Sequence, residues 1–234
     1  MAFPVVQATN TSATLTAGTS HVVSLPAGIV AGDLLIICLD KGSTSATVNA
    51  HADWTELLDE ASANGLYIAY RWAAGGETNP TLVTSAATRS AEATFRISGA
   101  ENPAIQAPQI GTTSSGASTT PDPPTTTPTG GAKDYLWITF CGSAGEQADD
   151  GTFCTAFPTG YTDNQLEKTC GVAGTNLGGL IAAATKQANA ASDNPATFTI
   201  SESLGWRAQT IAIHPAPALP PTPIYPIVPT RRPA

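Results

Sequence analysis

Residues 26–40, PAGIVAGDLLIICLD, join a glycine-rich turn directly to a run in which residues 34–39 are all apolar. A run this short, and apolar at every position, is typical of a strand that is buried on both faces of a sheet. A similar stretch, PTGGAKDYLWITF, recurs at residues 128–140. The chain therefore contains the same turn and buried strand twice, and this repetition decides its predicted fold.

Three further pairs of segments follow in the same order in both halves of the chain. They are residues 53–58 with 160–166, residues 66–70 with 180–184, and residues 93–97 with 210–213. An Asn-Pro pair also lies in each half, at 79–80 and 194–195. Matched landmarks at near-equal spacing predict an internal duplication, with pseudo-repeats at about residues 5–104 and 105–214.

Each repeat is predicted to consist of strands, because its apolar runs are short, rich in β-branched and aromatic residues, and separated by Gly, Pro, Asn and Ser. About five strands per repeat give two sheets, whose apolar faces must cover one another. The predicted fold class is an all-β, jelly-roll-like β-sandwich over residues 1–214. Either both repeats share one sandwich or each forms its own small domain. The single sandwich is preferred, because residues 106–127 then correspond to the polar residues 9–20.

The composition limits the classes of partner. The 234-residue chain has only 12% charged residues, about half the usual share, and a net charge of −8. An acidic chain lacks the basic surface that nucleic acids require, so we expect no nucleic-acid partner. The start has no basic n-region, and the longest apolar run is far shorter than the ~20 residues of a membrane helix. We therefore expect a soluble protein, made in a cytoplasm, with no membrane partner.

The composition changes abruptly at the arm, defined as residues 215–234, where eight of 20 residues are proline. Proline prevents helix and ladder formation, so the arm is predicted to extend as polyproline II over about 60 Å. Residues 1–214 carry 8 basic and 18 acidic side chains, net −10, whereas the arm carries two arginines, net +2. Such an arm suits docking on a like subunit or on another acidic shell. The residues expected to make that contact are Pro220, Pro221, Ile224, Tyr225, Ile227, Val228, Arg231 and Arg232.

Histidines and carboxylates give no strong catalytic or metal signature. The histidines lack metal-ligand spacing and are expected at the surface or at strand ends. They are His21, His51 and His214. The densest carboxylate cluster is Glu56, Asp59 and Glu60. Glycosidases use paired carboxylates as catalytic groups. On a strand, however, Asp59 points away from Glu56 and Glu60, so a solvated strand end is the preferred interpretation.

Two further clusters have a functional and a structural interpretation. Oxygen ligands for calcium could come from Glu146, Asp149, Asp150 and Gly151, although a solvated turn is preferred. Four aromatic residues could form a sugar-stacking platform, although alternation along strands favours the core. They are Trp54, Tyr67, Tyr70 and Trp72. The sequence therefore predicts no catalytic residue, no metal ligand and no cofactor.

The four cysteines show no C-x-x-C spacing, which argues against a zinc site or a redox motif. Cys38 and Cys141 lie in apolar runs and are expected to be buried thiols. Cys154 and Cys170 lie in a loop-like stretch, where a disulfide would close a loop of about 15 residues. The sequence leaves open whether these two cysteines are bridged.

Several short motifs carry a resemblance to a known family. They are, in order, Pro26-Ala27-Gly28, Gly32-Asp33-Leu34-Leu35, Asp53-Trp54-Thr55, Tyr70-Arg71-Trp72-Ala73 and Gly76-Glu77. This series resembles a family of bacteriophage and prophage virion proteins, over about residues 5–215. The sequence departs from the family at two positions. Asp53 stands where the family has glycine before the tryptophan, and Thr78 stands where the family has proline after the glutamate. The resemblance implies a β-sandwich on the outside of a phage particle.

The expected function is that of a non-enzymatic virion structural protein, and specifically a capsid decoration (cement) protein. Its arm would bind the major capsid protein or copies of itself, so that the chain forms a homo-oligomer on the particle. The alternative is a carbohydrate- or receptor-binding module of a tail fibre, or another tail or baseplate component. In either case the protein would be made in the host cytoplasm and reside in the virion.

Overall fold

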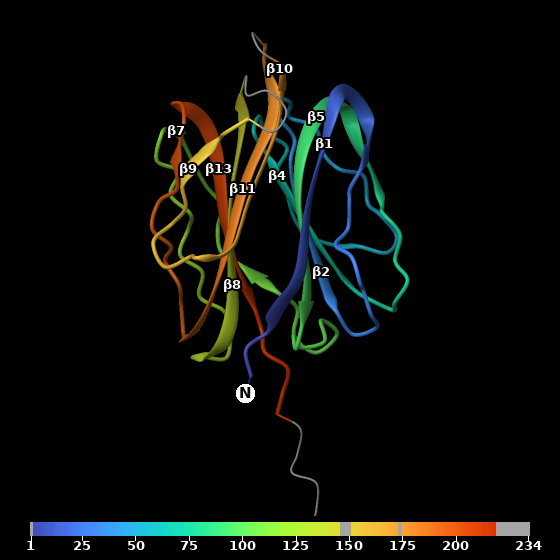
Figure 1. The fold of residues 1–234 in the computed structure, drawn as a ribbon, viewed down its shortest axis with the longest axis vertical. Coiled ribbons are helices and arrows are strands. Elements are labelled where there is room, and N and C mark those ends of the chain that lie inside the picture. Colours follow the sequence, from blue (N-terminus) through green and yellow to red (C-terminus); the bar gives the residue numbers. More distant parts are fainter. Residues whose placement is uncertain (1, 146–150, 173–174, 219–234) are drawn as a thin grey trace, which may run out of the picture.

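The computed structural model describes residues 2–145, 151–172 and 175–218. These residues form thirteen strands and no helix, which confirms the predicted all-β class. Every pairing between the strands is antiparallel. Two large sheets lie face to face as a sandwich (Figure 1).

The first sheet is built from the first repeat, in the order β1-β5-β2-β4-β3. Its strands are β1 (Val5–Val22), β2 (Leu34–Asp40), β3 (Thr55–Asp59), β4 (Leu66–Trp72) and β5 (Thr81–Ser98). The buried strand predicted at residues 34–39 is β2, and it occupies the middle of this sheet.

The second sheet is built from the second repeat, in the order β10-β11-β8-β13-β6, with β7 also pairing with β13. Its strands are β6 (Gln109–Ile110), β7 (Ser114–Ser118), β8 (Lys133–Gly145), β10 (Asp163–Val172), β11 (Thr175–Ala190) and β13 (Leu204–Ile213). A separate small sheet pairs β9 (Cys154–Ala156) with β12 (Thr199–Ile200).

The two large sheets have the same topology. Read from its β6 edge, the second sheet has the order β6, β13, β8, β11, β10. This order matches β1, β5, β2, β4, β3 of the first sheet strand for strand. The small β9–β12 sheet also has a counterpart, the isolated bridge between Val48 and Thr84. The two halves of the chain thus form sheets with the same strand order.

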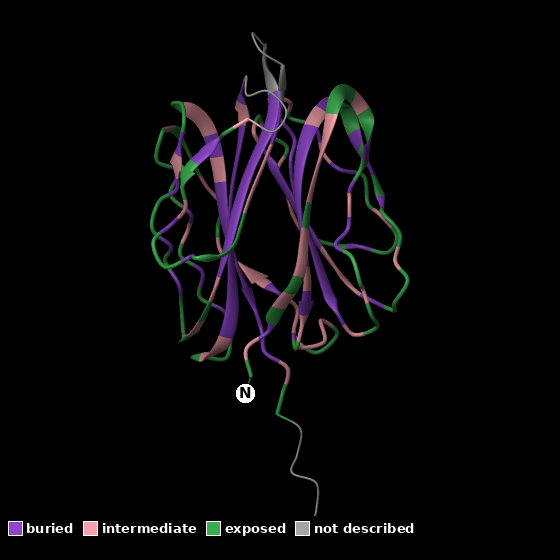
Figure 2. Cartoon of the chain, viewed as in Figure 1, coloured by how far each residue is buried: buried purple, intermediate pink, exposed green. Residues whose placement is uncertain are grey.

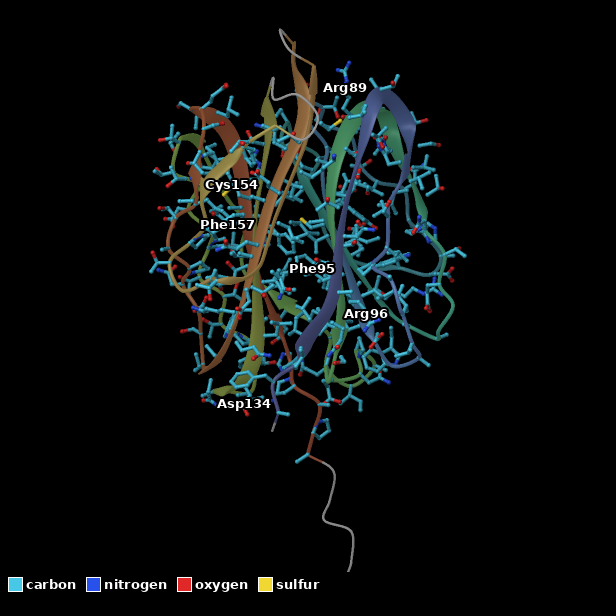
Figure 3. The ribbon with its side chains drawn as sticks, viewed as in Figure 1. Arg89, Phe95, Arg96, Asp134, Cys154 and Phe157 are labelled. Atoms are coloured by element: carbon cyan, nitrogen blue, oxygen red, sulfur yellow. The ribbon has the colours of Figure 1, made fainter. Side chains whose placement is uncertain are left out.

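The two sheets share one apolar core. Alternate residues of β2, such as Leu34 and Ile36, face the second sheet, which contributes residues such as Ile138 and Ile211. The ring of Phe95 on β5 meets Phe140 on β8 edge-to-face, with the ring centroids 5.9 Å apart. Figure 2 shows the buried strips along both sheets, and Figure 3 shows Phe95 between them.

The outer face of each sheet is covered by the loops of its own repeat. On the first sheet, Leu35, Ile37 and Leu39 of β2 pack under Val23 and Trp54. On the second, Cys141 of β8 packs with residues of β9 and β12. Both faces of the central strands are therefore buried from solvent, which explains why residues 34–39 are apolar at every position.

The sheets approach each other closely at Asp40, which is fully buried at the end of β2. Its Oδ1 accepts hydrogen bonds from Gly42 N of its own repeat, at 2.8 Å, and from Leu180 N of the other repeat, at 3.3 Å. Burial raises the pKa of the Asp40 carboxyl well above its usual range. A Cβ added to Gly179 would lie 2.8 Å from Ala91 N and 3.0 Å from Asp40 O, so only glycine fits between the sheets there.

We predict that Gly179→Ala lowers the free energy of unfolding by about 2 to 3 kcal/mol, because the new methyl group meets backbone atoms of the opposite sheet. Gly18→Ala is the matched control, since its Cβ would find nothing closer than 3.8 Å. Chemical denaturation of both variants checks the prediction. Equal stabilities for the two variants would contradict this packing of the sheets.

Candidate functional site

The described chain leaves the sandwich through residues 214–218, at the end where the N-terminal residues also lie (Figure 1). We call this end the arm pole. Two backbone hydrogen bonds hold the root of the arm against residues 99–101: Glu101 N to His214 O at 2.8 Å, and Ala216 N to Gly99 O at 2.9 Å. Because these residues join the two repeats, the same segment links the sheets and fixes where the arm begins.

The proposed contact residues of the arm lie outside the described residues. This applies to Pro220, Pro221, Ile224, Tyr225, Ile227, Val228, Arg231 and Arg232. The last two described residues, Pro217 and Ala218, are exposed at the arm pole.

His214 packs at the root of the arm, directly after the end of β13, so it lies at a strand end and not at the surface. Its ring is buried and meets Tyr135 edge-to-face, with the centroids 5.0 Å apart. Nε2 lies 3.1 Å from Gln109 Oε1, whereas Nδ1 has no hydrogen-bond partner. Burial, with a smaller contribution from the charge of Lys133, lowers the pKa of His214 to about 4. The ring is therefore neutral near pH 7.

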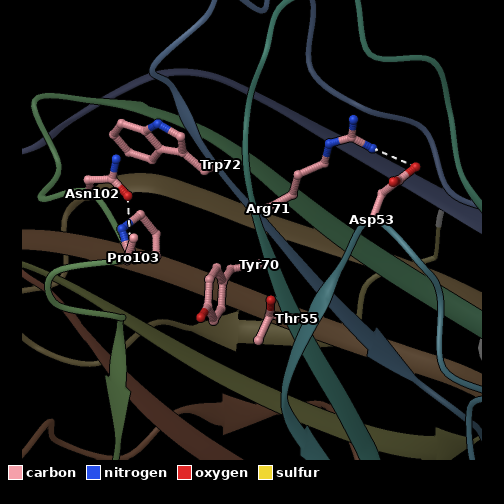
Figure 4. A pocket seen from close by; sticks show the side chains of 8 residues that line it. Asp53, Thr55, Tyr70, Arg71, Trp72, Asn102 and Pro103 are labelled. Atoms are coloured by element: carbon pink, nitrogen blue, oxygen red, sulfur yellow. Dashed lines mark hydrogen bonds and ion pairs between the residues drawn. The ribbon is translucent and has the colours of Figure 1, made fainter.

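A groove opens beside this root, and we call it the aromatic groove (Figure 4). It has a volume of about 540 Å³ and is lined by β3, β4 and the segment after β5. Its residues are Asp53, Thr55, Tyr70, Arg71, Trp72, Asn102, Pro103 and Ala104. Tyr70 and Trp72 alternate along β4, so both half-buried rings point to the same side of the sheet.

The proposed four-residue aromatic platform does not exist, because its members lie on opposite faces of the first sheet. Trp54 and Tyr67 are buried on the outer face of the first sheet with Leu35 and Ile37. Tyr70 and Trp72 pack instead at the margin of the shared core and reach the groove.

The charge beside the aromatic groove is negative. Arg71 forms ion pairs with Asp53, at 3.2 Å, and with Glu77, at 3.6 Å. The Asp53 side chain remains 60% exposed, whereas Glu77 is only 2% exposed. Two carboxylates therefore share one guanidinium, which leaves an excess negative charge, and the exposed carboxylate of the pair is Asp53.

The second repeat has a groove at the corresponding place, but without aromatic side chains. Thr185 and Gln187 lie opposite Ile138 and Leu136 of β8, as Tyr70 and Trp72 lie opposite Ile36 and Leu34 of β2. This second groove has a volume of about 410 Å³. Its residues are Val5, Val6, Leu136, Thr162, Asp163, Asn164, Thr185 and Gln187.

The predicted solvated strand end holds for Glu56, which is exposed, but not for Asp59 and Glu60, which are partly buried. A bulge between Glu56 and Leu58 shifts the faces of the strand. Asp59 pairs with the buried Lys41 and also accepts a hydrogen bond from Val48 N, at 2.7 Å. Glu60 accepts one from Leu66 N at 3.2 Å. Asp59 and Glu60 therefore hold the loops around β3 together.

The disulfide considered between Cys154 and Cys170 is not formed, because the two lie on opposite faces of the second sheet. Cys154 packs against the outer face of the second sheet (Figure 3), and its S–H group donates a hydrogen bond to Ala156 O, at 3.4 Å. Cys170 packs in the shared core and donates to Thr14 O, at 3.0 Å. All four cysteines are buried free thiols. Burial raises the pKa of Cys154 to about 12 and that of Cys170 to about 11.

The calcium ligands considered at Glu146, Asp149 and Asp150 lie outside the described residues. Gly151, at the edge of that gap, donates its N–H to Thr169 Oγ1 at 2.9 Å. Within residues 2–145, 151–172 and 175–218, no group of three His, Cys, Asp or Glu side chains could hold a metal ion. The same residues contain no helix long and apolar enough to cross a membrane.

A serine, a histidine and a carboxylate meet between the paired strands β1 and β5, which the sequence does not indicate. Ser90 Oγ lies 2.8 Å from His21 Nδ1 and donates to Glu92, which also accepts from Ser12 at 2.8 Å. Burial lowers the pKa of His21 and raises that of Glu92. The serine bridges the other two groups instead of being activated by the histidine, and His21, Ser90 and Glu92 are fully buried. We interpret this chain as a polar tie between the strands.

Two of the motifs that carry the family resemblance, Pro26-Ala27-Gly28 and Gly32-Asp33-Leu34-Leu35, stabilise loops. Asp33 accepts a hydrogen bond from Val30 N at 3.0 Å and forms an ion pair with Arg96 at 3.5 Å. Arg96 also donates to the carbonyl groups of Ala27 and Gly28. The Pro-Ala-Gly and Gly-Asp motifs are thus clamped to β5, and they bring no reactive group to the surface.

Neither family models, nor curated proteins, nor solved structures match this chain.

We predict that acidification weakens the fold through His214. Its pKa falls from an ordinary 6.5 to about 4 on folding, so the unfolded chain binds more protons between these values. Stability is then lost as the pH falls, and His214→Phe removes this loss while keeping the ring contact with Tyr135. Between about pH 7 and about pH 5, the wild type should lose roughly 2 kcal/mol more than His214→Phe. Urea denaturation at both pH values measures this difference, and equal losses would contradict it.

Proposed function

We propose that this chain is a non-enzymatic structural protein of a phage virion, and that it decorates the capsid. The observation that carries the proposal is the anchored root of the arm, where residues 214–216 are hydrogen-bonded to residues 99–101. An arm that is fixed at its base and has proline at eight of its 20 positions loses little conformational freedom when it binds a neighbour. The chain thus combines a closed β-sandwich with a basic strap that starts at one defined end.

The remaining chemistry of the described residues also supports a structural role. The Ser90, His21 and Glu92 side chains are fully buried, and the carboxylates of β3 hold loops in place. Burial keeps the cysteine thiols protonated, so they are poor nucleophiles. These groups stabilise the sandwich and do not converge on a shared reaction centre.

The binding partners in this proposal are the major capsid protein and other copies of the chain. Many copies on a lattice bind with high avidity even when each arm contact is weak, because neighbouring sites raise the effective concentration. The acidic body, net −10, and the arm, net +2, make contacts between an arm and an adjacent body electrostatically favourable.

We predict that a chain ending at Ala218 keeps the stability of the full chain but loses particle binding. The truncation removes both arginines and six of the eight prolines of the arm, and it preserves every strand and the pairing of Ala216 with Gly99. Occupancy on particles assembled without the chain should fall by at least about tenfold, as measured by co-sedimentation.

The matched control carries residues 219–234 in scrambled order, which keeps the length and composition of the arm. It should bind as weakly as the truncated chain if specific contacts are required. Full occupancy by the truncated chain would overturn the proposal.

A further inference from the structure

The prolines of the arm follow a strict period over most of its length. Proline stands at every third position in Pro217, Pro220, Pro223, Pro226 and Pro229. A polyproline II helix has three residues per turn, so these five rings would lie along one edge. The two residues between successive prolines of this series would lie on the other two edges of such a helix. The arm thus has the P-x-x-P pattern that aromatic grooves recognise.

The aromatic groove has the side chains that such a ridge requires. The rings of Tyr70 and Trp72 project from β4 into the groove, and Asn102 and Pro103 lie next to them (Figure 4). Thr55 lies directly opposite Tyr70 in the sheet register and brings a hydroxyl group to the same groove. Proline rings pack on aromatic faces, while the carbonyl groups between them need donors of this kind.

The charges of the arm and of the groove are complementary. The proline series ends at Pro229 and is followed by Arg231 and Arg232. Beside the two aromatic rings lies Asp53, whose exposed carboxylate shares Arg71 with the buried Glu77. An arm laid along the aromatic rings can place an arginine near this excess negative charge, which also fixes its direction.

The location of the groove favours an arm from another molecule. Residues 99–101 hold the arm root, and the next residues, 102–104, form the wall of the groove. To enter its own groove, the arm would have to reverse direction at once, and a run with proline at every third position resists such a reversal. An arm arriving from a neighbour meets no such constraint.

We propose that the aromatic groove binds the proline-rich arm, residues 217–232, of a second copy of this chain. This inference rests on the proposed function, because it names the surface to which the arm attaches. Each copy would donate one arm and receive one, which makes the contact heterologous and lets it propagate around a ring or across a lattice.

The test is the self-association of the full chain in sedimentation experiments over a range of concentrations. We expect concentration-dependent association, and we expect a synthetic peptide of residues 215–234 to dissociate it. Trp72→Leu, which retains an apolar side chain, should weaken the association by about tenfold. Gln187→Leu at the matching position of the second groove is the control and should change it by less than about twofold.

A charge exchange tests the same contact without touching the core. Asp53→Lys alone, or Arg231→Glu with Arg232→Glu alone, should weaken the association, and the three changes together should restore it. Asp53 is largely exposed, so loss of folding does not explain an effect there. Circular dichroism and thermal melting confirm the fold of each variant, and added salt should weaken the wild-type contact.

Several outcomes would overturn the inference. These are a chain that stays monomeric at every concentration, an association that Trp72→Leu leaves unchanged, and a groove that binds oligosaccharides but not the arm peptide. None of them bears on particle binding by the truncated chain. If the chain ending at Ala218 loses particle binding while Trp72→Leu keeps it, the proposed function stands and the arm binds another shell subunit. If truncation leaves particle binding intact, the proposed function itself fails.

Discussion

The close approach of the two sheets at Asp40 and Gly179 is the constraint on which the rest of the structure depends. Leu180 N donates to Asp40 from the opposite sheet, and glycine leaves room for backbone against backbone. Neither sheet can stand alone, because the face that meets the other sheet is apolar along its length. Joining two similar halves thus completes a core that one half does not possess.

The segment between the repeats shows how a single connection can serve several purposes. Residues 99–101 receive the root of the arm, and residues 102–104 form one wall of the aromatic groove. A rigid base for the arm and a candidate receptor for it are therefore built from adjacent residues. The two halves differ at the groove. The positions of Tyr70 and Trp72 in the first half are occupied by Thr185 and Gln187 in the second.

Much of the fold could be predicted from local patterns, but the faces of individual strands could not. The sequence match pairs Leu66 with Leu180, yet Leu66 faces the shared core and Leu180 packs in an outer cluster. A shift of one residue reverses the two faces of a strand, and only the pairing between strands fixes it. The bulge in β3 likewise shifts the register before Asp59, so the face that simple alternation predicts for Asp59 was wrong.

The sequence by itself determined the all-β class, the position of the buried strand at residues 34–39 and the distinct composition of the arm. These features follow from local hydrophobic pattern and proline content, which need no knowledge of distant contacts. Only the tertiary structure decided that His21 and His214 are buried, that Cys154 and Cys170 lie on opposite faces of a sheet, and that Trp72 and Asn102 share a groove. Burial and proximity depend on how the two sheets pack, and residues far apart in the chain meet only after that packing is complete.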